Sequence, residues 1–175
     1  MNYLKGIIFL TTLLVLSRII PHPPNFTPIL AGIIFLPFIK RDIKFSVFVP
    51  IGGMLISDFI IGMHSLMLWT YGPIIILSLL SYYFSNDKAS RIASLAIASP
   101  AVFYLMSNFG VWINSPMYTK DFSGLIQCYV NAIPFYASSA LACILFSAVF
   151  FLMMNSYKKN GLVSVSYTHL RAHET

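Results

Sequence analysis

The chain has 175 residues, of which 58% are hydrophobic and only 9% are charged, and its formal net charge is +6 at pH 7. A soluble domain carries about 25% charged residues. Eleven basic and five acidic side chains are too few to cover a water-facing surface, which excludes an ordinary soluble enzyme and a nucleic-acid-binding domain. The composition therefore predicts an all-α membrane protein. Because a span with its loop uses about 25–30 residues, about six transmembrane helices fit, in one domain.

Apolar runs separated by polar or proline-rich connectors predict six helices. They cover residues 4–20, 27–39, 45–63, 66–84, 92–113 and 134–154. The second run is short for a span. In the connector Pro21–Pro28, three prolines in four residues exclude a helix, because proline lacks an N–H donor and restricts the residue before it. The longest polar stretch, Asn114–Asn131, is expected to be a second elaborate connector.

The last twelve residues, Ser164–Thr175, differ sharply in composition from the rest of the chain. They are polar, contain two histidines and have no apolar periodicity. The segment resembles a translated sequencing adapter, and a genuine polar tail is the alternative. We therefore expect a single transmembrane domain over residues 1–163 and give residues 164–175 no functional role.

Basic residues gather at one set of helix ends, which predicts the orientation of the chain. With the N-terminus in the cytoplasm, only Arg18 and Lys120 lie on the outer side. The basic residues on the inner side are Lys5, Lys40, Arg41, Lys44, Lys88, Arg91, Lys158 and Lys159. This positive-inside bias predicts a multi-pass protein of the inner (plasma) membrane with both termini in the cytoplasm. Both elaborate connectors then face the exterior.

Two ionisable side chains, Arg18 and Asp58, lie inside the expected spans, where charged groups are costly and by default mark function. At 1.5 Å per residue, Arg18 lies about 21 Å and Asp58 about 20 Å above the cytoplasmic edge. The same count places Asn108 at about 24 Å. The three groups are therefore able to form one polar layer in the outer third of a membrane core that is about 30 Å thick.

The two charges admit three interpretations. In the first, Arg18 offers its planar fork to a carboxylate or phosphate, or pairs with Asp58 to shape the floor of a solute site. In the second, an Arg18–Asp58 ion pair only locks two helices together. In the third, Arg18 extends to the outer headgroups because it lies near the end of its helix.

Residues of the outer connectors extend the candidate site. Aromatic rings and amides suit a flat heterocyclic ligand, although Trp112 and Tyr129 fit an interfacial aromatic belt equally well. Catalytic motifs and metal-ligand spacings are absent from the sequence, so neither an enzyme nor a metal or cofactor site is expected. The expected substrate-binding residues are Arg18, His22, Asn25, Asp58, Asn108, Trp112 and Tyr129.

Several sequence segments together carry a resemblance to a known family. They are Arg18–Pro28 (RIIPHPPNFTP), Ser57–Gly62 (SDFIIG), Ser107–Trp112 (SNFGVW), Gly124–Tyr129 (GLIQCY) and Asn131–Pro134 (NAIP). They are similar to an uncharacterised family of bacterial inner-membrane proteins with six helices, which resembles the substrate-capture (S) components of energy-coupling-factor vitamin transporters. The resemblance implies a six-helix bundle that binds a micronutrient near the outer face, beneath a lid formed by Pro21–Pro28.

The same resemblance implies partners. An S component docks on a transmembrane scaffold protein that two ATPase subunits drive, usually through an Ala-x-x-x-Ala pattern on its first helix. Gly6–Ser17 departs from the family here, because it lacks this pattern. Docking on the shared scaffold, action without a partner and use of a different partner therefore all stay open. We expect the substrate-binding membrane component of a micronutrient uptake transporter. The alternatives are a non-transporting membrane scaffold of an envelope complex and a proton-coupled carrier that uses Asp58.

Overall fold

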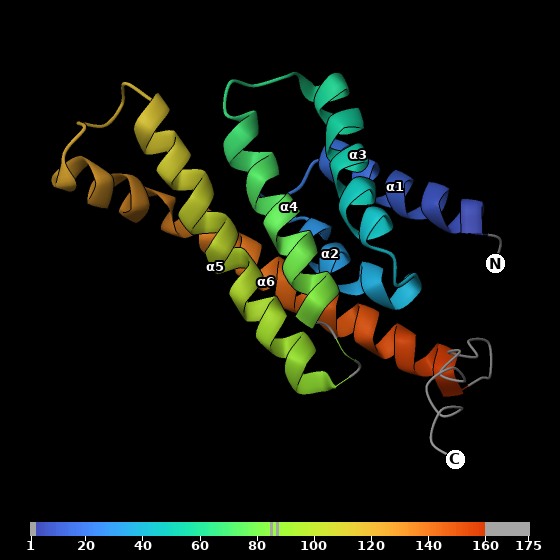
Figure 1. Cartoon of the computed structure of the whole chain (residues 1–175). Helices are drawn as coiled ribbons and strands as arrows, with labels where there is room; N and C mark the ends of the chain where they lie inside the picture. Colours follow the sequence, from blue (N-terminus) through green and yellow to red (C-terminus); the bar gives the residue numbers. More distant parts are fainter. Residues whose placement is uncertain (1–2, 85, 87, 160–175) are drawn as a thin grey trace, which may run out of the picture.

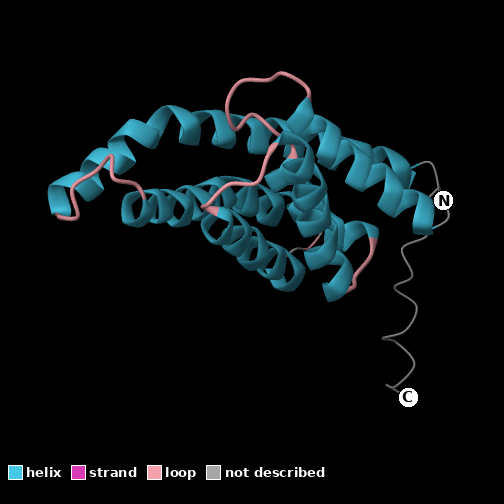
Figure 2. Ribbon diagram, turned by 90° about the horizontal axis from the view of Figure 1, so that it is seen from above, coloured by secondary structure: helices cyan, strands magenta, loops and turns pink. Residues whose placement is uncertain are grey.

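A computed structural model of the chain describes residues 3–84, 86 and 88–159. The helices are α1 (Tyr3–Ile19), α2 (Ile29–Ile39), α3 (Ile43–Ile61), α4 (Met67–Phe84), α5 (Ala89–Asn114) and α6 (Phe122–Lys159). Within the described residues there is no β-strand (Figures 1 and 2). The expectation of an all-α fold is therefore confirmed. The segment Ser164–Thr175 lies outside the described residues.

The last helix differs most from expectation. We expected Asn114–Asn131 to be a connector, but α6 begins at Phe122 and continues for 38 residues. Asp121 explains the early start, because its carboxylate accepts a hydrogen bond from the backbone N–H of Gly124 (2.7 Å) and so caps the first turn. Pro134, where the helix was expected to start, lies inside it. The prediction of a long outer connector is wrong.

Four helices, α3 to α6, are long and apolar enough to cross a membrane. The remaining two are shorter, with 17 residues in α1 and 11 in α2, and α2 rises by only about 16 Å. Large apolar side chains face outward, as expected of a surface in contact with lipid rather than water. Examples are Phe48, Phe59, Leu68, Ile97 and Leu152. The fold is thus that of a helical membrane protein.

The short helix α2 lies at the centre of the bundle. It packs against α3, α4, α5 and α6, and eight of its eleven residues are buried. A helix that is apolar on all sides is expected to be enclosed by other helices, which accounts for this unusually short apolar run. Small buried side chains such as Ser78 and Ser81 of α4 let the helix backbones approach closely.

The outer helices lie at two edges of the molecule (Figure 1). At one edge, α1 packs against α3. At the other, α5 and α6 form an antiparallel hairpin that projects past α4. The ends of α1 and α3 and the starts of α2 and α4 therefore meet beside the hairpin, and this meeting point holds the polar residues described next.

Candidate functional site

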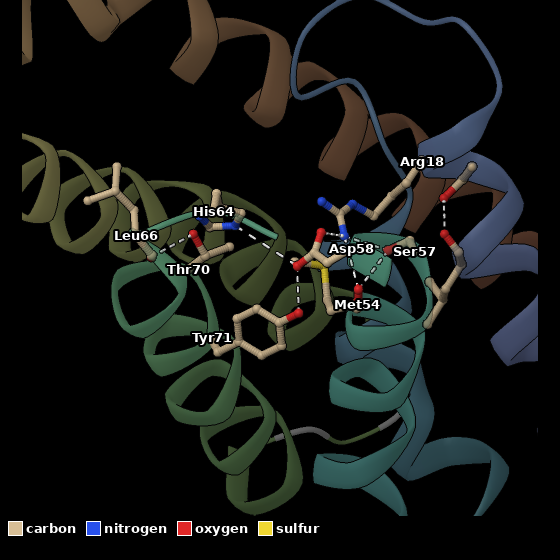
Figure 3. A network of polar contacts seen from close by, with 10 residues as sticks. Arg18, Met54, Ser57, Asp58, His64, Leu66, Thr70 and Tyr71 are labelled. Atoms are coloured by element: carbon tan, nitrogen blue, oxygen red, sulfur yellow. Dashed lines mark hydrogen bonds and ion pairs between the residues drawn. The ribbon is translucent and has the colours of Figure 1, made fainter. Parts of the chain in front are cut away.

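Arg18 and Asp58 form an ion pair where α1 and α3 end. Nη1 of Arg18 lies 2.6 Å from Oδ1 of Asp58, which confirms the expectation that the two charges lie at the same depth. The side chain of Asp58 is only 1% exposed and that of Arg18 is 19% exposed. The guanidinium points toward α3 in the interior (Figure 3), so the interpretation that Arg18 extends to the outer headgroups is wrong.

The second oxygen of the Asp58 carboxylate binds α4. The hydroxyl of Tyr71 donates a hydrogen bond to Oδ2 (2.5 Å). Nε2 of His64, in the loop between α3 and α4, lies 3.9 Å from the same oxygen (Figure 3). One buried carboxylate therefore joins three helices, and both of its oxygens have partners.

Arg18 uses only one nitrogen of its guanidinium. Besides Asp58, Nη1 donates to the hydroxyl of Ser57 (2.5 Å) and to the carbonyl of Met54 (3.2 Å). The cation also lies at the C-terminal ends of α1 and α3, where the helix dipoles favour positive charge. Nε and Nη2 have no hydrogen-bond partner in the part of the chain that the structure describes. One edge of the planar fork is thus free to bind a ligand.

We call Arg18, Ser57, Asp58 and Tyr71 the buried ionic network. The sequence analysis did not include Tyr71 among the site residues. Its position could have indicated it, because Tyr71 and Asp58 are at similar distances from the turn between α3 and α4. Asp58 precedes the end of α3 by three residues and Tyr71 follows the start of α4 by four. Gly62 ends α3 with φ 122°, a conformation that glycine adopts readily, and its N–H bonds the carbonyl of Asp58 (2.8 Å). The turn therefore places the first residues of α4 beside the end of α3, and Tyr71 beside Asp58.

A cavity of about 230 Å³ lies against Arg18. It is lined by the connector between α1 and α2, by the first residues of α2 and by residues of α3, α4, α5 and α6. The polar side chains in its lining are Arg18, His22, Asn25, Thr27, Thr70 and Ser139. Three of the expected site residues, Arg18, His22 and Asn25, therefore share one cavity, and Asp58 holds the first of them in place.

The connector Pro21–Pro28 forms one wall of this cavity and is held against α6. The carbonyl of Asn25 accepts a hydrogen bond from the hydroxyl of Ser139 (3.5 Å), and the ring of Phe26 lies 5.9 Å from that of Phe146. Asn25 has φ 61°, a left-handed conformation that asparagine tolerates better than most residues. The connector is thus folded onto the bundle.

The other three expected site residues lie in the α5–α6 hairpin and not in the lining of the cavity. The Asn108 amide donates to a carbonyl of its own helix (2.9 Å). The Trp112 indole donates to the carbonyl of Thr119 (2.9 Å), and the Tyr129 hydroxyl donates to that of Leu105 (2.8 Å). These groups stabilise the hairpin. The single polar layer expected to include Asn108 is not formed, because its amide is bonded within α5.

The described residues contain no group of three His, Cys, Asp or Glu side chains that could hold a metal ion. The two cysteines, Cys128 and Cys143, are free thiols buried in the bundle. The polar groups of the cavity lining are therefore a guanidinium, three hydroxyls, an amide and an imidazole.

Comparison with known proteins places the chain in a family. A family model described as a family of unknown function, DUF6580, matches residues 3–164. No curated protein and no solved structure matches the chain. The match includes the connector Pro21–Pro28, the buried ionic network and the whole cavity lining. Because it covers nearly the whole chain, the protein belongs to the DUF6580 family.

Proposed function

We propose that this chain is the substrate-binding membrane component of an uptake transporter for a small, vitamin-like micronutrient, similar to the S components of energy-coupling-factor transporters. The observation that carries the proposal is the free edge of Arg18 in the wall of a cavity of about 230 Å³. An ion pair that served only to join α1 and α3 would need no open space beside its cation. Charged groups in membrane-spanning helices face bundle interiors or cavities, and they mark substrate pathways.

The proposed orientation puts both termini in the cytoplasm of a plasma (inner) membrane and the cavity toward the exterior. Basic side chains support it, because Lys40, Arg41 and Lys44 lie between α2 and the start of α3, at the opposite ends of these helices from the cavity. Lys88, just before α5, and Arg91, in the first turn of α5, lie at the same end. In this orientation Pro21–Pro28 is the lid that a ligand passes.

A proton-coupled carrier is the second candidate, and His64 favours it. Its Nε2 lies 3.9 Å from Oδ2 of Asp58, whose other oxygen binds Arg18. A proton on His64 would attract the Asp58 carboxylate and so compete with Arg18 for it. Transport would then follow the proton gradient instead of ATP hydrolysis on a docked ATPase module.

Native mass spectrometry of the chain purified in mild detergent tests the binding proposal. We expect a small-molecule adduct on the wild-type chain that is absent from the Arg18→Ala and Asp58→Ala variants. Arg91→Ala and Asp42→Ala are the matched controls, because both residues lie outside the cavity lining, and they should keep the adduct. A wild-type chain that carries no ligand, and that recovers envelope-assembly enzymes in a pull-down, contradicts the proposal and supports a scaffold.

Uptake of the identified adduct into vesicles separates the two transport mechanisms. An ATP-driven system should keep importing after a protonophore collapses the proton gradient, and it should co-purify with ATPase subunits. A proton-coupled carrier should stop under the same treatment and should also fail in His64→Gln, which keeps a polar side chain but loses the imidazole ring. Loss of uptake in the presence of the protonophore would contradict the ATP-driven mechanism and support the proton-coupled carrier.

A further inference from the structure

We infer that the ligand of this cavity is a small organic monoanion whose carboxylate binds the free edge of Arg18, and that Asp58 is a positioning residue that does not touch the ligand. The inference rests on the proposed function, since it concerns the same cavity. It gives Arg18 and Asp58 different roles, whereas the sequence alone places both among the substrate-binding residues.

The accessible charge in the cavity is positive. Asp58 is 1% exposed, with Oδ1 on Arg18 and Oδ2 on Tyr71, so a ligand cannot reach a free carboxylate oxygen there. No Asp or Glu of the described residues lines the cavity. By contrast, Nε and Nη2 of Arg18 are unused donors. A cationic ligand would therefore find no free carboxylate oxygen to bind, whereas an anion would find two unused N–H donors.

The start of α2 adds to this positive character. Ile29 and Leu30, the first residues of the helix, line the cavity. No side chain caps this terminus, and the first helical N–H bond in the segment runs from Gly32 to the carbonyl of Pro28 (2.7 Å). The uncapped N–H groups of a first turn carry a partial positive charge of about half a unit. They favour an anion bound beside Arg18.

A monoanion fits better than a dianion. Asp58 already balances the charge of Arg18, so a bound carboxylate leaves about one net negative charge, offset in part by the start of α2. A phosphate dianion would leave about two, and burying charge without a partner is costly. A planar carboxylate also matches the two parallel N–H donors on the free edge of a guanidinium.

The rest of the cavity selects for size and apolarity. Its volume of about 230 Å³ is below the 300–1,000 Å³ that is typical of pockets for drug-sized ligands. The apolar side chains in its lining are Ile29, Leu30, Met54, Ile61, Ile74 and Phe103. The ligand is therefore a compact acid with an apolar body about the size of one ring, held at one end by Arg18.

Two sets of matched probes test this inference on the purified full chain. Benzoate, benzamide and benzylamine share one shape and carry a negative, zero and positive charge, and hexanoate, hexanamide and hexylamine form an aliphatic set. We expect at least one acid at millimolar concentration to raise the melting temperature of the wild-type chain, with no comparable rise from its amide or amine. If neither acid stabilises the chain more than its amide and amine do, the inference is overturned.

The variant Arg18→Lys separates binding from folding. A lysine can keep the ion pair with Asp58, but its single ammonium has no second edge for a ligand. We expect its ligand-free melting temperature to stay close to that of the wild type and its affinity for the acid to fall at least tenfold. Arg91→Lys is the matched control and should bind normally. Undiminished affinity in Arg18→Lys would overturn the role of Arg18, and the wild-type probe sets decide the matter if this variant does not fold.

The identity of the co-purifying adduct distinguishes this inference from the proposed function. A carboxylic acid supports both. A neutral or cationic adduct that depends on Arg18 overturns the inference and leaves the proposed function standing. A chain that carries no adduct and responds to no probe overturns both.

Discussion

Arg18 on α1 is held by Asp58 on α3 through a 2.6 Å ion pair, and the acid is the more deeply buried partner of the two. Because α1 packs mainly against α3, this ion pair joins the first helix to the bundle together with the hydrogen bonds from Arg18 to Ser57 and Met54. It also holds the guanidinium in the wall of the cavity. The stability of the fold and the proposed binding of a ligand therefore share one carboxylate.

Removing one partner of this ion pair should destabilise the fold strongly. Arg18→Ala leaves the carboxylate of Asp58 buried without its cation, and breaking a buried pair in this way costs roughly 3–5 kcal/mol. Replacing both partners, as Arg18→Met with Asp58→Leu, should restore much of this stability, because apolar substitutes of a buried pair are often neutral. Thermal unfolding in detergent measures both. Equal stability of wild type and Arg18→Ala would contradict the prediction.

Tyr71→Phe should lower stability by about 1.5–3 kcal/mol, the usual range for a hydrogen bond to a charged group. The change removes only the hydroxyl that donates to Oδ2 of Asp58. Tyr83→Phe is the matched control, because Tyr83 is an exposed tyrosine of the same helix, and it should unfold like the wild type. Chemical unfolding in mixed micelles compares the two variants. An equal effect of both substitutions would show that the Tyr71 hydroxyl does not stabilise the buried ionic network.

Gly110→Ala should disrupt the contact between α4 and α5. A Cβ atom at Gly110 would overlap the ring of Trp69, and overpacking of this kind costs about 1–3 kcal/mol. Gly72→Ala, where a Cβ meets nothing within 4 Å, should be neutral or stabilising by up to about 1 kcal/mol, because alanine favours the helix over glycine. Thermal unfolding of the two variants in parallel gives the answer. A destabilised Gly72→Ala with an unaffected Gly110→Ala would contradict it.

Acid should weaken the start of α6. The N–H of Gly124 and, secondarily, the hydroxyl of Thr119 donate to Asp121 and hold its pKa below the ordinary value of 3.8. A lowered pKa stabilises the fold fully above the ordinary value, and this contribution is lost as the pH falls through the folded value. Asp121→Asn keeps a capping side chain but cannot titrate.

The melting temperature of wild type and Asp121→Asn as a function of pH checks this assignment. The difference between the two should be constant near neutral pH and should shrink below about pH 4. A difference that does not change across this range would show that Asp121 does not cap α6 as a carboxylate.

Single cysteines should report the orientation of the chain. Cys128 and Cys143 are buried, so they should give little background with a membrane-impermeant maleimide. Met117→Cys, in the exposed loop between α5 and α6, should label in intact cells. Lys88→Cys, which is exposed before α5, should label only after the membrane is opened. The reverse pattern would invert the proposed topology.

The sequence predicts the helices well wherever apolar runs are bounded by charged or proline-rich segments. The expected ranges 45–63 and 66–84 agree within a few residues with α3 and α4. The start of α6 was missed because Gln127 and Asn131 make its first turns polar and Pro134 resembles a helix start. The signal that predicts the true start is Asp121, an N-cap residue that precedes Phe122.

Part of the site was also predictable. Depth counting brings Arg18 and Asp58 together because each lies near the C-terminal end of its helix, and a rise of 1.5 Å per residue is reliable over three or four turns. The same counting failed for Asn108, since depth does not determine which side of α5 a residue occupies or that its amide bonds its own helix. Tertiary packing decides both, and a single sequence does not specify it.

The ion pair has a consequence for biosynthesis. Asp58 follows Arg18 by 40 residues, so at about 5–20 residues per second the ribosome delivers the counter-ion roughly 2–8 s after the cation. In the proposed topology, the nascent first segment therefore carries an unneutralised guanidinium during that interval. Its cation gains a buried counter-ion only once α3 has been made.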